Sequence, residues 1–215
     1  MARLLQPASY ARMRRYAKTG GVTDMTVGFI VLAVVLVLLA LLLIVFLATY
    51  NGLVRSRIRC REAWSGIDVQ LKRRASLIPN VVETVKGYAA HEREVLENVT
   101  RARAMLEQAG SAGQAAQADN ALTGALRSLF AVAENYPQLK ANENFLALQQ
   151  ELSDVEEKIA FSRQFYNRNV MDFNQRIEVF PNVILAGMFN FEPFEFFEAE
   201  EAAREDVQVS FTATA

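Results

Sequence analysis

The sequence predicts an all-α protein in which a single N-terminal transmembrane helix continues into an elongated antiparallel helical bundle. Three observations predict this fold. Residues 27–48 are uncharged and apolar, apolar residues then recur three and four positions apart, and one low-complexity stretch interrupts that pattern. The 215 residues leave enough chain after the apolar run for one domain with a core.

The apolar run VGFIVLAVVLVLLALLLIVFLA would be about 33 Å long as a helix, which is enough to cross the hydrocarbon core of a bilayer. It is longer than the apolar part of a secretory signal, and no small-x-small cleavage pattern with a turn-rich mature start follows it. We therefore expect an uncleaved transmembrane helix over residues 25–49, with the lipid bilayer as a partner.

Residues 1–24 form a basic head with five basic residues and Asp24. A second basic stretch, residues 55–74, carries seven basic residues against Glu62 and Asp68. Basic loops beside a span stay in the cytoplasm, so the second stretch favours a cytoplasmic C-terminal domain, whereas the head competes with it. Translation from Met25 would remove the head, and both starts remain open.

We expect a helical domain over residues 50–206 and a frayed tail over 207–215. The first domain helix is expected to run from Tyr50 to about Gln108, with a kink near Ser76–Asn80 that Pro79 imposes. Residues 109–120, AGSAGQAAQADN, are expected to form a mobile loop.

A short helix should follow from Ala121 to about Asn135, capped by Asp119 or Asn120. The next expected helix runs from about Asn142, whose side chain is a candidate cap, to Phe180, where Pro181 stops it. Its apolar residues alternate at spacings of three and four, which is a heptad-like pattern and is typical of a coiled-coil seam.

The chain contains one histidine, His91, which excludes zinc and di-iron sites that need two histidines. We expect His91 to be an exposed helix residue. The sequence has no dinucleotide, phosphate-loop or serine-hydrolase motif, so we predict no enzyme, no cofactor and no metal. Cys60 is alone; a semi-buried structural thiol is favoured over a lipidated or intermolecular cysteine.

Six residues are candidates for fixing helix register or for binding a partner. Arg163, Tyr166 and Asn167 lie within FSRQFYN at spacings that share a helix face. Trp64 lies on the apolar stripe of the first domain helix. Phe194 and Phe197 belong to the acidic, phenylalanine-rich segment NFEPFEFFEAEEAARED, whose rings are expected to cap the end of the bundle or to dock a partner.

The phrases YNGLVRSR, EAWSGIDVQLKRRASLIPNVVETVKGYAAHE, NALTGALRSLFAVAENYPQLKANENFLALQQEL and IAFSRQFYNRNVMDFNQRIEVFPN resemble the LemA family of bacterial membrane proteins. The resemblance covers roughly Met25 to Val209, and residues 1–24 depart from it. It implies a single N-terminal span in the bacterial inner membrane, a cytosolic or periplasmic helical bundle, and no assigned enzymatic activity.

These observations predict a non-enzymatic, membrane-anchored scaffold or assembly protein of the bacterial envelope that associates with further copies of itself. The basic residues 55–74 and the acidic residues 192–206 could meet between neighbouring copies. The alternative is an accessory subunit that presents substrates to a membrane protease or transporter. No aromatic-and-basic recognition module accompanies the basic stretches, so nucleic acid is not an expected partner.

Overall fold

The computed structural model describes the backbone of residues 9–198 and the side chains of residues 25–198. The described part is helical without strands, which confirms the predicted all-α class. The chain divides into two compact units between Asn51 and Gly52. The tail expected at 207–215, the acidic residues 199–206 and the side chains of the basic head lie outside the described residues.

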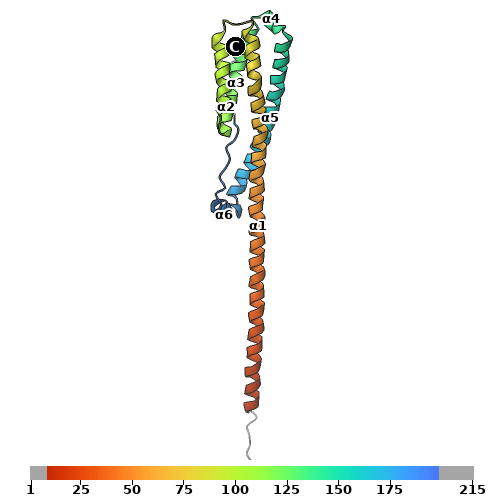
Figure 1. Ribbon diagram of the computed structural model, residues 1–215. Helices are drawn as coiled ribbons and strands as arrows, with labels where there is room; N and C mark the ends of the chain where they lie inside the picture. The colour runs from red at the N-terminus through yellow and green to blue at the C-terminus, as the bar shows by residue number, and fades with distance from the viewer. Residues whose placement is uncertain (1–8, 199–215) are drawn as a thin grey trace, which may run out of the picture. The chain divides into compact units, whose positions relative to one another are not determined.

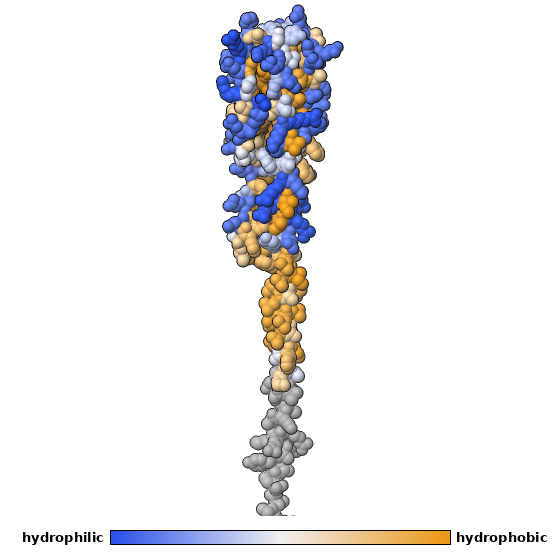
Figure 2. Space-filling model, viewed as in Figure 1, coloured by the Kyte–Doolittle hydropathy of each residue, from blue (hydrophilic) through white to orange (hydrophobic). Residues whose placement is uncertain are grey.

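Helix α1 extends from Ser9 to Lys86 and contains the apolar run. It is long and apolar enough to cross a membrane, and its large side chains between Val27 and Leu47 are exposed except for the half-buried Phe46, from 44% at Val35 to 69% at Phe29. These side chains give the run its orange surface in Figure 2. The helix continues through Pro79, so the proline does not end it.

The second unit is an antiparallel bundle of α1 from Gly52 onward, α2 (Arg93–Gln108), α3 (Ala112–Ala133) and α5 (Glu143–Glu178), with two short helices, α4 (Pro137–Lys140) and α6 (Asn182–Met188) (Figure 1). Contacts between α1 and α5 show their direction. Ser56 lies at Asp172, whereas Arg74, further along α1, lies at the earlier residue Glu156.

The core of the bundle contains apolar side chains from all four long helices, including the fully buried Ile67, Leu122, Phe145 and Phe173. One buried polar group crosses this core. The guanidinium of Arg74 pairs with Asp119 of α3, donates to Thr123 at 3.0 Å and pairs with Glu156 of α5 at 2.7 Å. These contacts join three helices at one level. They offset the cost of burying the guanidinium through its two terminal nitrogens, whereas its buried Nε has no hydrogen-bond partner.

The first domain helix was predicted to run to about Gln108, and this is wrong. Helix α1 ends at Lys86, and residues 87–92 form a turn before α2. Gly87 lies at the break, where the N–H groups of Tyr88 and Ala89 both bond to the carbonyl of Val85 and tighten the last turn. His91 is exposed, but it lies in this turn and not in a helix.

The mobile loop predicted over 109–120 is also wrong, because α3 begins at Ala112 and not at Ala121. Ser111 caps it by accepting a hydrogen bond from the N–H of Gln114 at 3.3 Å. Ala115, Ala116 and Ala118 are buried. Alanine is the best helix former, and its small side chain lets the helices approach closely, so a stretch that looks like low-complexity sequence is part of the core.

Helix α5 matches its prediction. It begins at Glu143 and ends at Glu178, shortly before Pro181. Asn142 caps it, since its side-chain oxygen accepts a hydrogen bond from the N–H of Phe145 at 3.0 Å. The caps and the proline therefore determine both ends of the longest helix that lies wholly within the second unit.

Candidate functional site: the closing segment on α1 and α5

The two halves of the bundle differ in what covers α1 and α5. Helices α2 and α3 cover them near the α4 end, but α2 stops at Gln108 and α3 starts at Ala112, while α1 and α5 continue alongside each other. After α6 the chain returns along this uncovered part of α1 and α5, as a thin blue trace without helix or strand in Figure 1. We call residues 190–198 the closing segment, because they cover the part of α1 and α5 that α2 and α3 leave.

Two asparagines of α5 bind the backbone of the closing segment. Asn167 accepts from the N–H of Phe197 and donates to its carbonyl, both at 2.9 Å. Asn174 makes the same pair of bonds with Phe194, both at 3.0 Å. The Tyr166 hydroxyl donates to the carbonyl of Glu195 at 2.8 Å. The side chains thus pair with backbone groups that have no helix or sheet partner.

The positions of the two asparagines match the spacing of the segment. Asn167 and Asn174 are seven residues apart on α5, which is a rise of about 10.5 Å. Phe194 and Phe197 are three residues apart, and an extended chain covers about 10 Å over that interval. The order is reversed along the chain, so the segment runs antiparallel to α5.

Aromatic rings fill the space between the segment and the two helices. Trp64 of α1 lies 5.6 Å from Tyr166 and 6.4 Å from Phe197, measured between ring centroids. Phe173 lies 5.3 Å from Phe194 and 6.4 Å from Phe191. These separations are those of tilted and edge-on aromatic pairs, which add stabilisation beyond the buried area.

Arg57 completes this contact from α1. Its guanidinium carbon lies 4.8 Å from the centroid of the Phe191 ring, which is a cation–π distance. Arg57, Arg61, Trp64 and Tyr166 line a pocket of about 440 Å³ together with residues 110–112 and part of the closing segment. The Glu195 carboxylate accepts from the N–H of Gly113 at 3.4 Å, in the first turn of α3, where a negative charge is favoured.

The structure brings together five of the six residues that we singled out from the sequence: Trp64, Tyr166, Asn167, Phe194 and Phe197. The rings of Phe191 and Phe197 are buried along the side of the bundle, which differs from the expected cap over its end. Arg163 does not join them. Its charge acts instead on Asp119. The pKa of Asp119 is raised above its usual value because burial outweighs the lowering by Arg74 and Arg163.

Asn174, Phe191 and Arg57 are parts of this site that the sequence analysis did not single out. Asn174 follows Asn167 by seven residues, and Phe191 precedes Phe194 by three. Both intervals were visible in the sequence, because seven residues return to the same helix face. No sequence pattern distinguishes Arg57, since it is one of several arginines in a basic stretch.

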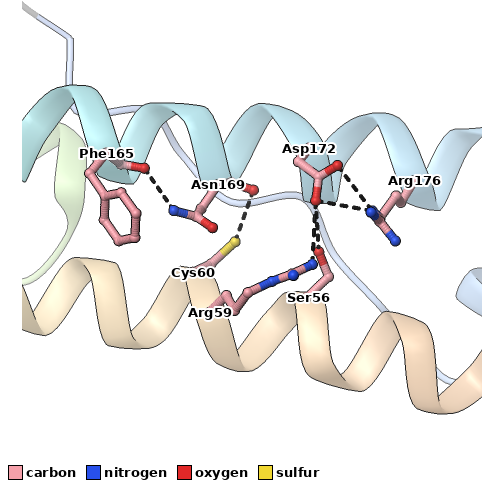
Figure 3. Close-up of polar contacts among 7 residues, drawn as sticks. All are labelled: Ser56, Arg59, Cys60, Phe165, Asn169, Asp172 and Arg176. Atoms are coloured by element: carbon pink, nitrogen blue, oxygen red, sulfur yellow. Dashed lines mark hydrogen bonds and ion pairs between the residues drawn. The ribbon is translucent and has the colours of Figure 1, made fainter.

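A second polar cluster joins α1 to α5 on another side of the pair (Figure 3). The Cys60 thiol donates to the carbonyl of Asn169 at 3.2 Å. Asp172 accepts from Ser56 at 3.4 Å and pairs with Arg176 at 3.0 Å and Arg59 at 3.5 Å. The cluster fixes the register of the two helices over about one turn of α1, from Ser56 to Cys60.

Burial raises the pKa of one titratable group in each cluster. Burial, with the nearby Asp172, raises the pKa of Cys60 to about 11, although Arg59 lowers it. Burial, together with Cys60 and Glu195, raises the pKa of Tyr166 to about 12. Cys60 is therefore a protonated thiol at neutral pH and is more deeply buried than the semi-buried thiol expected from the sequence, while Tyr166 remains a neutral hydrogen-bond donor.

Within residues 25–198, no three His, Cys, Asp or Glu side chains lie together in an arrangement that could hold a metal ion. The site described here is a packing and hydrogen-bonding arrangement, and its polar groups bind the chain itself.

The fold and the site define a class: a helical-bundle protein with one candidate membrane span, in which a segment near the C-terminus closes the bundle. A family model described as the LemA family matches residues 63–211, and the chain belongs to this family. The matched part contains most of the bundle and the whole closing segment, but it begins after the apolar run.

Named relatives extend over more of the chain. Protein LemA of Metamycoplasma hominis is 29% identical over 171 residues, which cover 77% of this chain and 76% of the relative. Magnetosome protein MamQ of Magnetospirillum gryphiswaldense is 23% identical, with 80% of this chain and 73% of the relative covered. Magnetosome protein MamQ 2 of Paramagnetospirillum magneticum is 24% identical, with 78% and 72% covered.

Proposed function

We propose that this protein is a non-enzymatic scaffold that is anchored in a membrane by α1 and associates with further copies of itself through its helical domain. The anchor is supported by the length and apolar composition of the run in α1, and by its large apolar side chains, most of which are exposed. In water such a surface is unfavourable, and a bilayer removes that cost.

The observation that carries self-association is an exposed aromatic pair on α5. Phe161 is 73% exposed and Phe165 is 54% exposed. The two rings lie one turn apart, and Phe165 is about 160° around the helix from Asn167. The pair is therefore on a different side of α5 from the closing segment. Exposed aromatic residues that lie together are typical of protein–protein interfaces.

Charge alone gives weaker support for contacts between copies. The acidic residues 192–198 lie beside the basic part of α1 within one chain, where Arg57 and Arg61 line the same pocket as Glu192 and Glu195. Part of the charge complementarity expected between neighbours is therefore met inside each molecule. This is why we place the contact between copies on the aromatic pair.

The proposal includes a location in the bacterial inner membrane with the domain in the cytoplasm. The arginines at positions 55, 57, 59 and 61 follow the apolar run directly, and basic residues close to a span stay inside. Protease digestion of right-side-out and inverted membrane vesicles tests the orientation. The domain should be cleaved only in inverted vesicles, and cleavage only in right-side-out vesicles would place it outside.

Native mass spectrometry of the full chain, extracted from its own membrane into lipid nanodiscs, tests self-association. The wild-type protein should be oligomeric, and the double variant Phe161→Ser/Phe165→Ser should shift towards the monomer. Gln164→Ser, an exposed change on the same helix, is the matched control and should leave the oligomer intact. A wild-type monomer at micromolar concentration contradicts the proposal, and a membrane protease or transporter bound in its place would favour the accessory-subunit alternative.

A further inference from the structure

The stretch that follows α5 and leads into the closing segment is uncharged and largely apolar. Residues 179–191 read VFPNVILAGMFNF and include α6. We call residues 179–189 the apolar foot. Its exposed large side chains, with exposures from 43% to 79%, are Val179, Phe180, Val183, Ile184, Met188 and Phe189.

The apolar foot is apolar on both of its sides. Leu185 and Ala186 of α6 are buried against the bundle, whereas Val183, Ile184 and Met188 face outward at 45%, 54% and 65% exposure. A surface helix of a soluble protein normally has a polar outer face. A helix that is apolar all round indicates an apolar environment on its outer side as well.

The foot lies at the end of the second unit through which α1 enters. Helix α5 runs antiparallel to α1, with Asn169 at Cys60 and Asp172 at Ser56. Its last turns therefore approach Gly52, the first residue of the unit, and α6 follows directly. In Figure 1, α6 lies at the opposite end of the bundle from α4, and Figure 2 shows pale-orange side chains at that end.

The chain length holds this end close to the apolar run. Gly52 lies four positions after Ala48, the last residue of the run. Even a fully extended chain covers no more than about 14 Å over that interval, and a helix covers about 6 Å. If residues 27–48 cross a bilayer, the end of the bundle that carries the foot must therefore lie near the bilayer surface.

We propose that the apolar foot inserts into the interface of the same bilayer that α1 crosses, as a second, non-spanning membrane contact. At thirteen uncharged residues, 179–191 are too short to cross the hydrocarbon core, so the foot would lie in the interface plane. Arginines 55, 57, 59 and 61, in the first turns of the unit, supply positive charge at head-group level. This inference rests on the membrane anchoring proposed above.

Fluorescence quenching on the full chain tests the contact. The protein is reconstituted in nanodiscs of phosphatidylcholine and phosphatidylglycerol, and an environment-sensitive dye is attached to Ile184→Cys. The lipids carry a spin-label quencher on the acyl chain. The native Cys60 interferes little, because it is fully buried and its pKa is raised to about 11.

Three further single-cysteine positions make the result specific. Leu38→Cys reports the span, and Gln175→Cys is an exposed polar position near the end of α5. Glu157→Cys is an exposed position in the four-helix part, by which we mean the half of the bundle where α2 and α3 cover α1 and α5. Dyes at Leu38 and Ile184 should be quenched about twofold or more, as expected for positions within the bilayer, and those at Gln175 and Glu157 should change little.

Each remaining outcome counts against a defined claim. Quenching at Leu38 with none at Ile184 above the Gln175 level overturns the foot contact and leaves the anchor standing. No quenching at Leu38 overturns the anchor itself. A dye at Ile184 that neither lipid nor aqueous quenchers reach indicates that a second copy covers the foot, which also overturns the inference.

A charge variant gives an independent check. Val183→Asp places a carboxylate on the outward face of α6, where it costs little in water but opposes insertion. It should reduce the quenching at Ile184 by about twofold or more, whereas Ser153→Asp, an exposed change on α5, should not. Unchanged quenching in Val183→Asp contradicts insertion of this face.

Discussion

The two halves of the bundle are stabilised in different ways. In the four-helix part, α1, α2, α3 and α5 satisfy their own backbone groups, and apolar side chains such as Leu122 and Phe145 supply the contacts. In the part that the closing segment covers, the returning chain belongs to no helix or sheet, and the side chains of Asn167, Asn174 and Tyr166 bond to its backbone. The closing segment should therefore detach without the helices unfolding, because a few side chains hold it.

The largest expected effect comes from removing a core ring in each half. Phe173→Ala and Phe145→Ala each delete a phenyl group from a residue no more than 1% exposed, and each should lower the free energy of unfolding by about 3–5 kcal/mol. Urea titration of the full chain in nanodiscs, followed by circular dichroism, measures this loss.

The two variants should differ in what is released first. Phe173 contacts Phe191 and Phe194, so Phe173→Ala should also make the closing segment sensitive to protease under native conditions. Phe145 contacts Phe130 within the four-helix part, and Phe145→Ala should not have this effect. Equal protease sensitivity in both variants would show that the halves unfold as one unit.

The next largest effect comes from removing the asparagine side chains that hold the closing segment on α5. Asn167→Ala and Asn174→Ala each leave one N–H and one carbonyl of the segment without their partner, which should cost about 1–3 kcal/mol per variant. Hydrogen exchange at Phe194 and Phe197 should speed up, while exchange in α2 and α3 should not.

Asn169→Ala is the matched control, because the half-buried Asn169 side chain donates to the Phe165 carbonyl within its own helix and does not contact the closing segment in the described bonds. It should change stability by less than about 0.5 kcal/mol. If it destabilises the protein as much as Asn167→Ala does, the special role of the asparagine pair is refuted.

The smallest effect concerns one hydroxyl. Tyr166→Phe removes the bond to the Glu195 carbonyl and should cost about 1 kcal/mol. The pKa of Tyr166 is raised from 10 to about 12 in the folded protein, so its contribution is full below pH 10 and is lost as the pH rises through 12. Denaturation curves between these pH values should fall more steeply for the wild-type protein than for Tyr166→Phe, and parallel curves would contradict this assignment.

Local sequence features predicted the elements whose ends are chemically marked. Asn142 and Pro181 determine α5, and both can be recognised without a structure. The start of α3 was missed because a run of alanines, glutamines and glycines has no apolar periodicity, although Ser111 is a good cap. The break at 87–92 was missed because Gly87 alone is a weak indication within an otherwise regular pattern.

The candidate site was predictable in its residues and unpredictable in its partners. Tyr166 and Asn167 attract attention because polar groups on an otherwise apolar helix face need partners. Their partners are backbone groups of Glu195 and Phe197, far along the chain, and no short-range pattern encodes that pairing. The same holds for Arg74, whose buried contacts with Asp119 and Glu156 depend on how three helices come together.

The distance from Asn167 to Asn174 along α5 matches the distance from Phe194 to Phe197 along the extended closing segment. This match restricts how the closing segment can change in length. Inserting or deleting one residue between the two phenylalanines would move one of them by about 3.3 Å, while a rigid helix keeps the asparagines where they are. Only one of the two anchor points could then stay engaged. Loops usually tolerate such changes in length. Here the fixed positions of Asn167 and Asn174 on α5 determine how many residues can lie between Phe194 and Phe197.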